Sequence, residues 1–453
     1  ELPGPHTERR RRAVPLRSPF SALHLWASPR PVCGGRVLMS DRTTDPLFLP
    51  KLPRVKQSTE LSNLRALFLQ LMQQETSWKP DTFPGSQPVS FERKHLGASS
   101  DERDKISLQT MGFYAAEKTD GMRYMLMILA SRGTYAVDRR FEFIKLPSMY
   151  FPLRGPGGQP DPSGALLDDT ILDGELVVDT RRKGTEEGTI DTVKELRYLC
   201  YDVCAVGGVC LMDKALPLRL MALRRDVLLP RYLAEASGHD FGTEPFGVDQ
   251  KDFFSIAHLP DLFAHVKPGT HDSEHLYAYQ DPLRKVEHGN DGVIFTPIMT
   301  PYQCGTCPAM LKWKPSNMNS IDFQLHTEWR RDAAKGGALT PRFSILYAAG
   351  GSLSESRYDW ITFDDELHKR FVRDPKADQR IIECVYDPDH ETITYSDSDD
   401  TWDYPTIRKG GWKYERMRED KELPNDVRVV MSVEKSAQDG VQMEELLDAM
   451  RRR

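Results

Sequence analysis

Apolar residues in the first two thirds of the chain follow two different periods. From Leu61 to Met72 they recur at helical spacing, which predicts an amphipathic helix that packs on the domain after it. Short apolar segments with the alternation of strands come next, separated by clusters of Gly, Pro and Asp. These predicted strands include residues 124–129, 171–178, 198–203 and 293–295. The mixture predicts an α+β domain.

Beyond about residue 330 the pattern changes to short strands at close intervals. They are predicted at residues 343–347, 358–363, 381–386 and 412–417, which is typical of a small barrel such as an OB-fold. The acidic stretch 396–403 is interpreted as a solvated hairpin loop within that barrel. The expected architecture is an α+β domain with antiparallel sheets, followed by a C-terminal OB-fold β-barrel.

The length of 453 residues exceeds what one hydrophobic core usually supports, so two domains with tails are expected. Residues 1–38 are rich in arginine, have only Glu1 and Glu8 as acids, and show no sustained periodicity. Their composition resembles a transit peptide, but we favour a disordered tail or sequence ahead of a natural start at Met39. The expected boundaries are a disordered basic arm at 1–57, a catalytic domain at 58–328, the barrel at 329–435, and a C-terminal helix or tail at 436–453.

Composition excludes several classes of protein. No apolar stretch approaches the ~20 residues of a membrane span, so an integral membrane protein is not expected. The formal net charge of -6 means that any nucleic-acid contact must come from a local basic cleft. Seven cysteines in a long chain favour a reducing compartment. Cys304 and Cys307 form one Cys-x-x-Cys without a second pair at zinc-ribbon spacing, so an ordinary loop is preferred to a metal site.

The clearest chemistry lies in Lys118-Thr-Asp-Gly-Met-Arg123, immediately before the strand predicted at 124–129. A lysine amine attacks phosphorus only when unprotonated, so its reference pKa of ~10.4 calls for partial burial and neighbouring cations. Gly121 allows the backbone to approach a nucleotide, and Arg123 supplies a forked donor. The predicted product is a phosphoramidate on Lys118. A surface turn with solvated charges is the alternative for so short a match.

Other charged residues occur at two-residue spacing, which places them on one face of a strand. Asp173 with Glu175 is one such pair, and Lys312 with Lys314 is another. The two lysines would place ammonium groups where the negative charge of a phosphate develops, while Trp313 faces the core.

Two further features complete the set. Arg416, Arg418 and Asp420 repeat the two-residue spacing in the predicted barrel. Asp291 precedes Gly292 at the start of an apolar strand, a favourable position for a Mg²⁺ ligand. Each feature alone has an ordinary interpretation as a solvated strand face or a turn. Their occurrence together and in this order favours a catalytic function.

This ordered set resembles the motifs of the covalent nucleotidyltransferases, and specifically those of eukaryotic mRNA capping enzyme guanylyltransferases. The resemblance runs from about residue 58 to 435 and places the nucleophile at Lys118. The matching segments are Phe83-Pro-Gly-Ser-Gln-Pro-Val-Ser90, Val137-Asp138-Arg139, Asp173-Gly-Glu175, Arg197-Tyr-Leu-Cys-Tyr-Asp202, Asp291-Gly-Val-Ile-Phe295, Lys312-Trp-Lys314, Asn319-Ser-Ile-Asp322-Phe and Arg416-x-Arg418-x-Asp420-Lys421. The Pro-Gly-x-Gln-Pro and Arg-x-Arg-x-Asp-Lys elements separate capping enzymes from DNA ligases. The implied fold is an ATP-grasp-like ligase/capping nucleotidyltransferase domain with an OB-fold.

The resemblance implies a two-step reaction. Lys118 attacks the α-phosphate of GTP, and GMP then passes to RNA that ends in a 5′-diphosphate, with Mg²⁺ or Mn²⁺ required. The implied roles are the α-phosphate for Lys312 and Lys314, metal or ribose for Asp291 and Glu175, the nucleotide for Arg123, Arg139 and Asp322, and the β- and γ-phosphates for Arg416, Arg418, Asp420 and Lys421. An apolar surface at residues 141–143 is expected to stack on guanine.

The resemblance also implies partners and a compartment. The triphosphatase is expected to be a separate protein, because the chain has no His-Cys-x5-Arg loop and its N-terminal region is short. A phosphorylated RNA polymerase II tail and a cap methyltransferase are further candidate partners, in the nucleus. An ATP-dependent RNA or DNA ligase with a lysyl-AMP intermediate is the alternative enzyme. A catalytically silent RNA-binding or scaffold protein is the alternative outside the enzymes.

Overall fold

The computed structural model describes residues 48–451 apart from 76, 98–105, 185–189, 270–274, 316–317, 355, 375, 397–401, 404 and 420. Most of the predicted basic arm therefore lies outside the described residues. Its last ten residues, also predicted to be disordered, contain helix α1 (Phe48–Lys51). Leu49 is buried and Leu52 packs beside it on the core of the first domain. The prediction of disorder up to residue 57 is wrong, because these apolar side chains bury against a packed surface.

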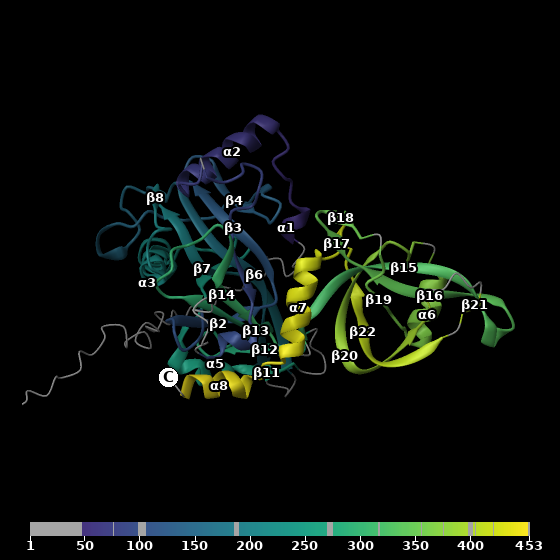
Figure 1. Ribbon diagram of the computed structural model, residues 1–453. Helices are drawn as coiled ribbons and strands as arrows, with labels where there is room; N and C mark the ends of the chain where they lie inside the picture. The colour runs from purple at the N-terminus through teal and green to yellow at the C-terminus, as the bar shows by residue number, and fades with distance from the viewer. Residues whose placement is uncertain are drawn as a thin grey trace, which may run out of the picture.

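Helix α2 (Ser58–Leu71) confirms the helix predicted from apolar spacing. Its buried face includes Leu64, Phe68 and Leu71, three residues that recur at helical intervals. Phe68 packs edge-on against Phe141 and Phe143, with ring centroids 5.4 and 6.0 Å apart. The helix therefore covers one side of the first domain, at the top of Figure 1.

The first domain is built on a 14-stranded sheet in the described part of the chain, with the main path β1-β14-β13-β6-β3-β4-β5. Nearly all of its pairings are antiparallel; β1 with β14 and β7 with β9 are the parallel ones. The strands are β1 (Ser86–Ser90), β2 (Phe113–Thr119), β3 (Met122–Leu129), β4 (Gly133–Val137), β5 (Phe143–Lys145), β6 (Thr170–Gly184), β7 (Ile190–Val206), β8 (Val209–Cys210), β9 (Gly247–Gln250), β10 (Phe254–Ser255), β11 (Val266–Pro268), β12 (Tyr277–Asp281), β13 (Val286–Pro297) and β14 (Gly305–Trp313). The helical segments are η2 (Arg93–His95), η3 (Pro156–Gly158), α3 (Leu216–Ala222), η4 (Leu223–Leu228), α4 (Leu229–Ala236), η5 (Ile256–His258) and α5 (Leu259–Ala264).

Strand β3 is buried on both faces, which explains its unbroken apolar sequence. Tyr124, Leu126 and Ile128 belong to one hydrophobic cluster, whereas Met125 and Met127 belong to another on the opposite face. A strand with two buried faces loses the alternation of apolar and polar residues. The strand that follows the Lys118 motif therefore lies at the centre of the domain.

The second domain holds a six-stranded sheet, ordered β19-β16-β15-β20-β22 with β21 beside β15. A bridge between Ile361 and Trp412 joins the segment after β19 to β22, so the two ends of the sheet meet. This closure is what a barrel requires, as the OB-fold prediction expects. The elements are β15 (Ser320–Asp332), η7 (Ala333–Lys335), β16 (Ala338–Leu346), β17 (Ala348–Ala349), β18 (Ser352–Leu353), β19 (Asp359–Trp360), α6 (Asp365–Arg373), β20 (Ile381–Thr394), β21 (Trp402–Asp403) and β22 (Thr406–Met417).

The domain boundaries differ from those expected. Strand β15 begins at Ser320 and pairs with β16 and β20 of the barrel, so the barrel starts before residue 329. The buried residues Ile321, Phe323 and Leu325 belong to the barrel core. Most of the acidic loop 396–403 lies outside the described residues, but its last two residues form β21 and pair with β15.

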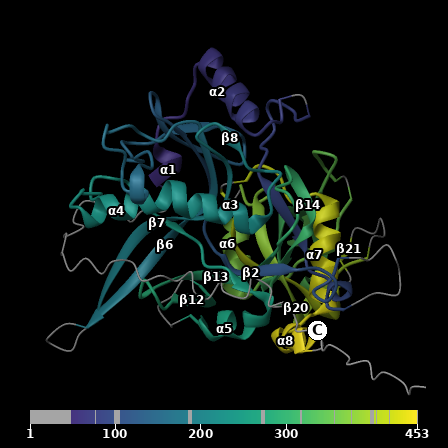
Figure 2. The same ribbon diagram turned by 90° about the vertical axis from the view of Figure 1, so that its left-hand side faces the viewer.

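The C-terminal helices α7 (Val427–Asp439) and α8 (Met443–Arg451) join the two domains. The side chain of Asp426 caps the start of α7, which therefore begins within the predicted barrel domain, not after it. Val430 and Val433 of α7 belong to the barrel core, whereas Leu446 of α8 belongs to a core cluster of the first domain. Figures 1 and 2 show α7 beside the barrel and α8 under the first domain. The chain thus enters the barrel once and returns to the first domain at its end.

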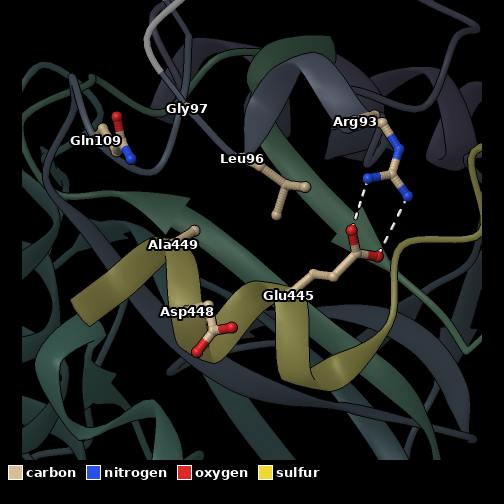
Figure 3. A pocket seen from close by; sticks show the side chains of 7 residues that line it. All are labelled: Arg93, Leu96, Gly97, Gln109, Glu445, Asp448 and Ala449. Atoms are coloured by element: carbon tan, nitrogen blue, oxygen red, sulfur yellow. Dashed lines mark hydrogen bonds and ion pairs between the residues drawn. The ribbon is translucent and has the colours of Figure 1, made fainter. Parts of the chain in front are cut away.

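A pocket of about 230 Å³ lies where α8 meets the first domain. Figure 3 shows Arg93 of η2 directed at Glu445 of α8, with their closest atoms 2.6 Å apart. Leu96 and Ala449 contribute the apolar part of the lining. None of the predicted catalytic or nucleotide-binding residues lines this pocket, so it lies away from the site described below. Among the described residues no helix is long and apolar enough to cross a bilayer.

Candidate active site

A β-bulge brings Asp291 to Lys118. Strand β13 pairs with β2 at Asn290 and again from Val293, so that Asp291 and Gly292 stand out of the ladder between them. Gly292 has φ 139°, and a Cβ atom there would lie 2.0 Å from the carbonyl oxygen of Trp313. Only glycine fits this position, because the bulge packs directly on the backbone of β14.

The Lys118 ammonium is bound to the Asp291 carboxylate. Its Nζ lies 2.6 and 2.8 Å from the two carboxylate oxygens, and its side chain is 23 % exposed. Lys314 binds the same carboxylate at 2.8 Å. Burial by itself lowers the pKa of Lys118, but the carboxylates of Asp291 and Glu175 outweigh it and the pKa is raised above its ordinary value. Asp291 therefore favours the ammonium form of Lys118, and the activation expected from neighbouring cations stays a prediction.

The pKa of Lys312 shifts in the opposite direction to that of Lys118. Burial, followed by the positive charges of Lys118 and Lys314, lowers the pKa of Lys312 to about 8, and Arg139 contributes in the same direction. Lys118 and Lys314 thus meet at Asp291, and their charges and that of Arg139 act on Lys312. The roles of these four residues toward a nucleotide stay a prediction. Trp313 is buried between the two strand lysines, as predicted.

Glu175 contacts the Lys118 motif through a hydrogen bond with Thr119. The Thr119 hydroxyl donates to the Glu175 carboxylate at 2.6 Å, and the buried Lys251 ammonium donates to the same hydroxyl oxygen at 2.7 Å. Lys251 also pairs with Glu117 at 2.8 Å. Sequence reasoning missed Lys251 and Glu117, since neither belongs to a spacing pattern that carries chemistry.

A buried charge network continues from Glu117 away from the site. His288 lies 3.4 Å from Glu117 and 3.0 Å from Asp179, which in turn pairs with Arg197. Burial opposes the imidazolium, but the two carboxylates raise the pKa of His288. The only hint in the sequence that His288 lies near the site is its position three residues before Asp291.

Arg123 is held by Asp173 and does not present a free guanidinium. It makes two hydrogen bonds to the Asp173 carboxylate, at 3.1 and 2.6 Å, and a third to the carbonyl of Ser86 at 2.6 Å. Tyr302 donates to the same carboxylate at 2.6 Å. Arg123 therefore holds the start of β1, and its contact with a nucleotide stays a prediction.

The expected guanine-stacking surface at residues 141–143 is wrong. Phe141 and Phe143 are fully buried and pack on Phe68 in the core of the first domain. An aromatic ring enclosed by α2 has no open face for a base. Arg139, two residues earlier, is exposed and close enough to Lys312 to influence its pKa.

The barrel residues form a second cluster. The buried Asp322 carboxylate accepts from Arg418 at 2.9 and 3.1 Å and also binds Lys421. Arg416 pairs with Glu383 at 2.6 Å and is 67 % exposed. Asp322 therefore positions two cations of the motif, and Asp420 lies outside the described residues. The structure places this cluster on the barrel, separate from the Lys118 cluster on the first domain.

Metal binding by protein groups alone is not supported in the described residues, where no group of three or more His, Cys, Asp or Glu side chains is positioned to hold a metal. Cys304 and Cys307 are free thiols, and Cys307 lies in strand β14 and not in the loop that the sequence suggested. Burial raises the pKa of Cys304 to about 12. The carboxylates beside Lys118 are Asp291 and Glu175, both of which act on its pKa.

Comparison with known proteins assigns the family. Residues 52–316 match the family "mRNA capping enzyme, catalytic domain", and residues 318–447 match "mRNA capping enzyme, C-terminal domain". The mRNA-capping enzyme subunit alpha of Schizosaccharomyces pombe is 30 % identical over 385 residues, with 82 % of this chain and 80 % of the relative covered. This chain belongs to the mRNA capping enzyme family.

Other capping enzymes show the same relation. The mRNA-capping enzyme subunit alpha of Saccharomyces cerevisiae is 28 % identical and covers 88 % of this chain and 84 % of itself. The mRNA-capping enzyme of Danio rerio is 29 % identical and covers 84 % of this chain, which spans 51 % of that protein. A mycobacterial DNA ligase D structure aligns with 76 % of this chain and 97 % of its own at 16 % identity and a TM-score of 0.30. The capping-enzyme domains divide at residues 316–318, close to where the structure begins the barrel at Ser320.

Proposed function

We propose that this capping enzyme is an mRNA guanylyltransferase that forms a covalent lysyl-GMP intermediate on Lys118 and transfers GMP to the 5′-diphosphate end of RNA. The observation that carries the proposal is the meeting of Lys118 with Lys312, Lys314 and Asp291 inside the region that matches the capping catalytic domain. A nucleophilic amine beside two further ammonium groups suits attack on a phosphate whose negative charge must be met.

In the first step the Lys118 Nζ gives a proton to solvent water, its lone pair attacks the α-phosphorus of GTP, and the bond from that phosphorus to the oxygen of pyrophosphate breaks. Because Asp291 stabilises the ammonium, its contact with Lys118 has to be released as the nucleotide binds. Lys312 and Lys314 meet the charge on the α-phosphate oxygens. In the second step an oxygen of the RNA diphosphate attacks phosphorus, the P–N bond breaks, and Nζ takes up a proton.

The donor set fits a divalent cation bound jointly with substrate. Mg²⁺ is usually held by one or two carboxylates together with substrate phosphates and water, and Asp291 and Glu175 supply two such carboxylates near Lys118. Mg²⁺ or Mn²⁺ bound there would offset negative charge on the phosphates. Competition of the cation for Asp291 also gives a reason for that carboxylate to leave Lys118.

The barrel cations act only if the two domains approach each other. Arg416, Arg418 and Lys421 lie on the barrel and Lys118 lies on the first domain, so closure is needed to bring them to the β- and γ-phosphates. Asp322 holds Arg418 and Lys421 ready for that contact. Opening after pyrophosphate leaves would expose the lysyl-GMP to RNA.

The cellular setting is a further part of the proposal. We propose a nuclear protein that receives 5′-diphosphate RNA from a separate RNA triphosphatase and delivers capped RNA to a cap methyltransferase. A phosphorylated RNA polymerase II tail is the proposed docking partner. These assignments rest on the resemblance to capping enzymes and on the chemistry of the acceptor; the names of the relatives support mRNA capping itself.

The test is covalent labelling of the purified chain. With Mg²⁺ and α-labelled GTP, label is expected to survive denaturing electrophoresis and to be absent from Lys118→Ala. Lys145→Ala is the matched control, because Lys145 is an exposed lysine on β5 outside the cluster. Label retained in Lys118→Ala would refute the nucleophile. Label from α-labelled ATP alone would indicate a ligase, and no label from either nucleotide would indicate a silent scaffold.

A further inference from the structure

The turn after Lys118 joins two strands that pair with different neighbours. Strand β2, which carries Lys118 near its end, pairs with β10 and β13, whereas β3 after the turn pairs with β4 and β6. In a tight hairpin the two flanking strands pair with each other and so fix the turn between them. The turn at Asp120 and Gly121 instead depends on contacts from other parts of the domain to hold its position.

Two hydrogen bonds tie this turn to strand β13. The Asp120 amide donates to the carbonyl of Gly289 at 2.9 Å. One residue later on β13, the Asn290 side chain donates to the carbonyl of Lys118 at 3.3 Å. Figure 1 shows β2, β13 and β12 together in the lower part of the first domain. The backbone that carries Lys118 and the backbone that carries Asp291 therefore form one hydrogen-bonded unit.

The side chain of His275 lies on the same unit. A Cβ atom at Gly289 would lie 2.5 Å from the His275 Nδ1 and 2.6 Å from its Cε1, so glycine makes room for the imidazole ring on β13. The His275 Nδ1 lies 3.1 Å from the Oδ2 of Asp120. The Gly269 amide donates to the carbonyl of Leu276 at 2.9 Å, next to His275 at the start of β12. The imidazole thus bridges the β11–β12 hairpin and the turn after Lys118.

The proton of this bridge belongs to the imidazole. The hydrogen bond from His275 lowers the pKa of Asp120; partial burial opposes the shift, and the positive charges of Lys118 and Lys314 add to it. An ionised carboxylate only accepts hydrogen bonds, so the His275 Nδ1 is the donor. Hydrogen bonds to an ionised acceptor are about twice as strong as those between neutral groups. The bridge is therefore a charge-assisted contact two residues from the predicted nucleophile.

We propose that His275 is a positioning residue for the first chemical step: its Nδ1 holds Asp120 and thereby fixes the end of β2 from which Lys118 reaches the α-phosphate. The proposal rests on the proposed function and adds to it a residue outside the recognised motifs. Attack on phosphorus requires the amine and the phosphate to be aligned, and a misplacement of about 1 Å costs up to ~100-fold in rate. His275 acts through Asp120 and not on the reacting atoms, so its loss changes the rate of attack more than the binding of GTP.

Leucine and asparagine in place of His275 separate the hydrogen bond from the packing. The two side chains share one branched shape, but only the asparagine amide places a donor where the imidazole Nδ1 stands. Full-length wild-type, His275→Leu and His275→Asn chains are mixed with Mg²⁺ and a range of α-labelled GTP concentrations, and the single-turnover rate of lysyl-GMP formation is measured. We expect His275→Leu to react about tenfold more slowly at saturating GTP, because one charge-assisted hydrogen bond is lost. The GTP concentration for half the maximal rate should stay within about twofold of wild type, and His275→Asn should recover most of the rate.

His258→Leu is the matched control. The His258 Nδ1 lies 2.9 Å from the Oδ2 of Asp261 in a second imidazole–carboxylate pair of similar exposure. It follows β10, which pairs with Tyr114 and Ala115 nearer the start of β2, at the other end of the strand from Lys118. We expect His258→Leu to react at the wild-type rate.

Thermal midpoints are measured for the same chains and are expected to agree, because the His275 bridge is partly exposed. A wild-type rate in His275→Leu, an equal loss in His275→Asn or in His258→Leu, or a loss confined to GTP affinity would overturn the proposal. So would a His275→Leu chain that melts earlier than His275→Asn or does not fold, since the bond would then serve stability. Failure of the wild-type chain to form lysyl-GMP would instead overturn the proposed function, and the inference with it.

Discussion

Replacement of Trp313 by phenylalanine tests how the C-terminal helices support the catalytic lysines. The Trp313 indole Nε1 donates to the carbonyl of Val441 at 2.8 Å, in the segment between α7 and α8. Phe263 packs edge-on against the same ring, with centroids 5.7 Å apart. Phenylalanine retains an aromatic ring but leaves the Val441 carbonyl, on a residue that is 4 % exposed, without its donor. An unpaired buried acceptor costs about 2 kcal/mol, which corresponds to about thirtyfold in an equilibrium constant.

The measurement is amide hydrogen exchange across α8. If the bond to Val441 holds α8 on the first domain, Trp313→Phe should speed exchange of the α8 amides about thirtyfold through local opening. Formation of lysyl-GMP should slow several-fold as well, because Lys312 and Lys314 flank the altered residue and small displacements of phosphate-binding groups are costly. The two readouts connect the packing of α8 with the chemistry at Lys118.

Trp412→Phe is the control for this experiment. Trp412 is also buried, at 2 % exposure against 6 % for Trp313, and packs on Phe323 in the barrel core, away from α8. Its replacement removes indole area without touching the bond to Val441. Unchanged α8 exchange in Trp313→Phe, or equal acceleration in Trp412→Phe, would refute the reasoning.

Two further predictions concern charge. Lys312, whose pKa is about 8, loses its positive charge as pH rises, from about nine tenths protonated at pH 7 to about one tenth at pH 9. Lysyl-GMP formation should therefore decline above pH 8 relative to Lys312→Arg, which stays charged; parallel pH profiles of the two proteins would contradict this. Asp202→Ala leaves the buried Arg219 without its carboxylate and should cost about 3–5 kcal/mol, seen as a lower thermal midpoint. Asp213→Ala, in an exposed pair with Lys214, should cost under about 1 kcal/mol; an equal loss in both variants would argue against the buried pair.

The sequence alone predicted which groups react, because phosphoryl transfer restricts both the residue types and their spacing. Lys312 and Lys314 fall on one face of β14 with Trp313 buried between them, since residues alternate in any strand. The order of the motifs indicated the capping family, which the two domain matches confirm. Local sequence was therefore enough to predict features that depend on residue periodicity or on a short motif.

Exposure was decided only by the tertiary structure. The pair Phe141 and Phe143 has the composition of a base-stacking surface, yet α2 covers it with Phe68, which is more than 70 positions earlier in the chain. The barrel boundary likewise depends on which strands β15 pairs with. The sequence of one strand does not specify which other strands it pairs with. Burial and pairing are properties of distant segments packed together.

The protonation state of Lys118 was also decided by long-range contacts. Its motif suggested an activated amine, but a bulge in β13 places Asp291, 173 positions later, within 2.6 Å of Nζ. The strength of an electrostatic interaction depends on the distance between the charges and on how deeply they are buried. The local sequence specifies neither quantity. The sequence thus indicated Lys118 as the predicted nucleophile, and the tertiary structure decided that its amine is bound to the Asp291 carboxylate, which raises the pKa of Lys118.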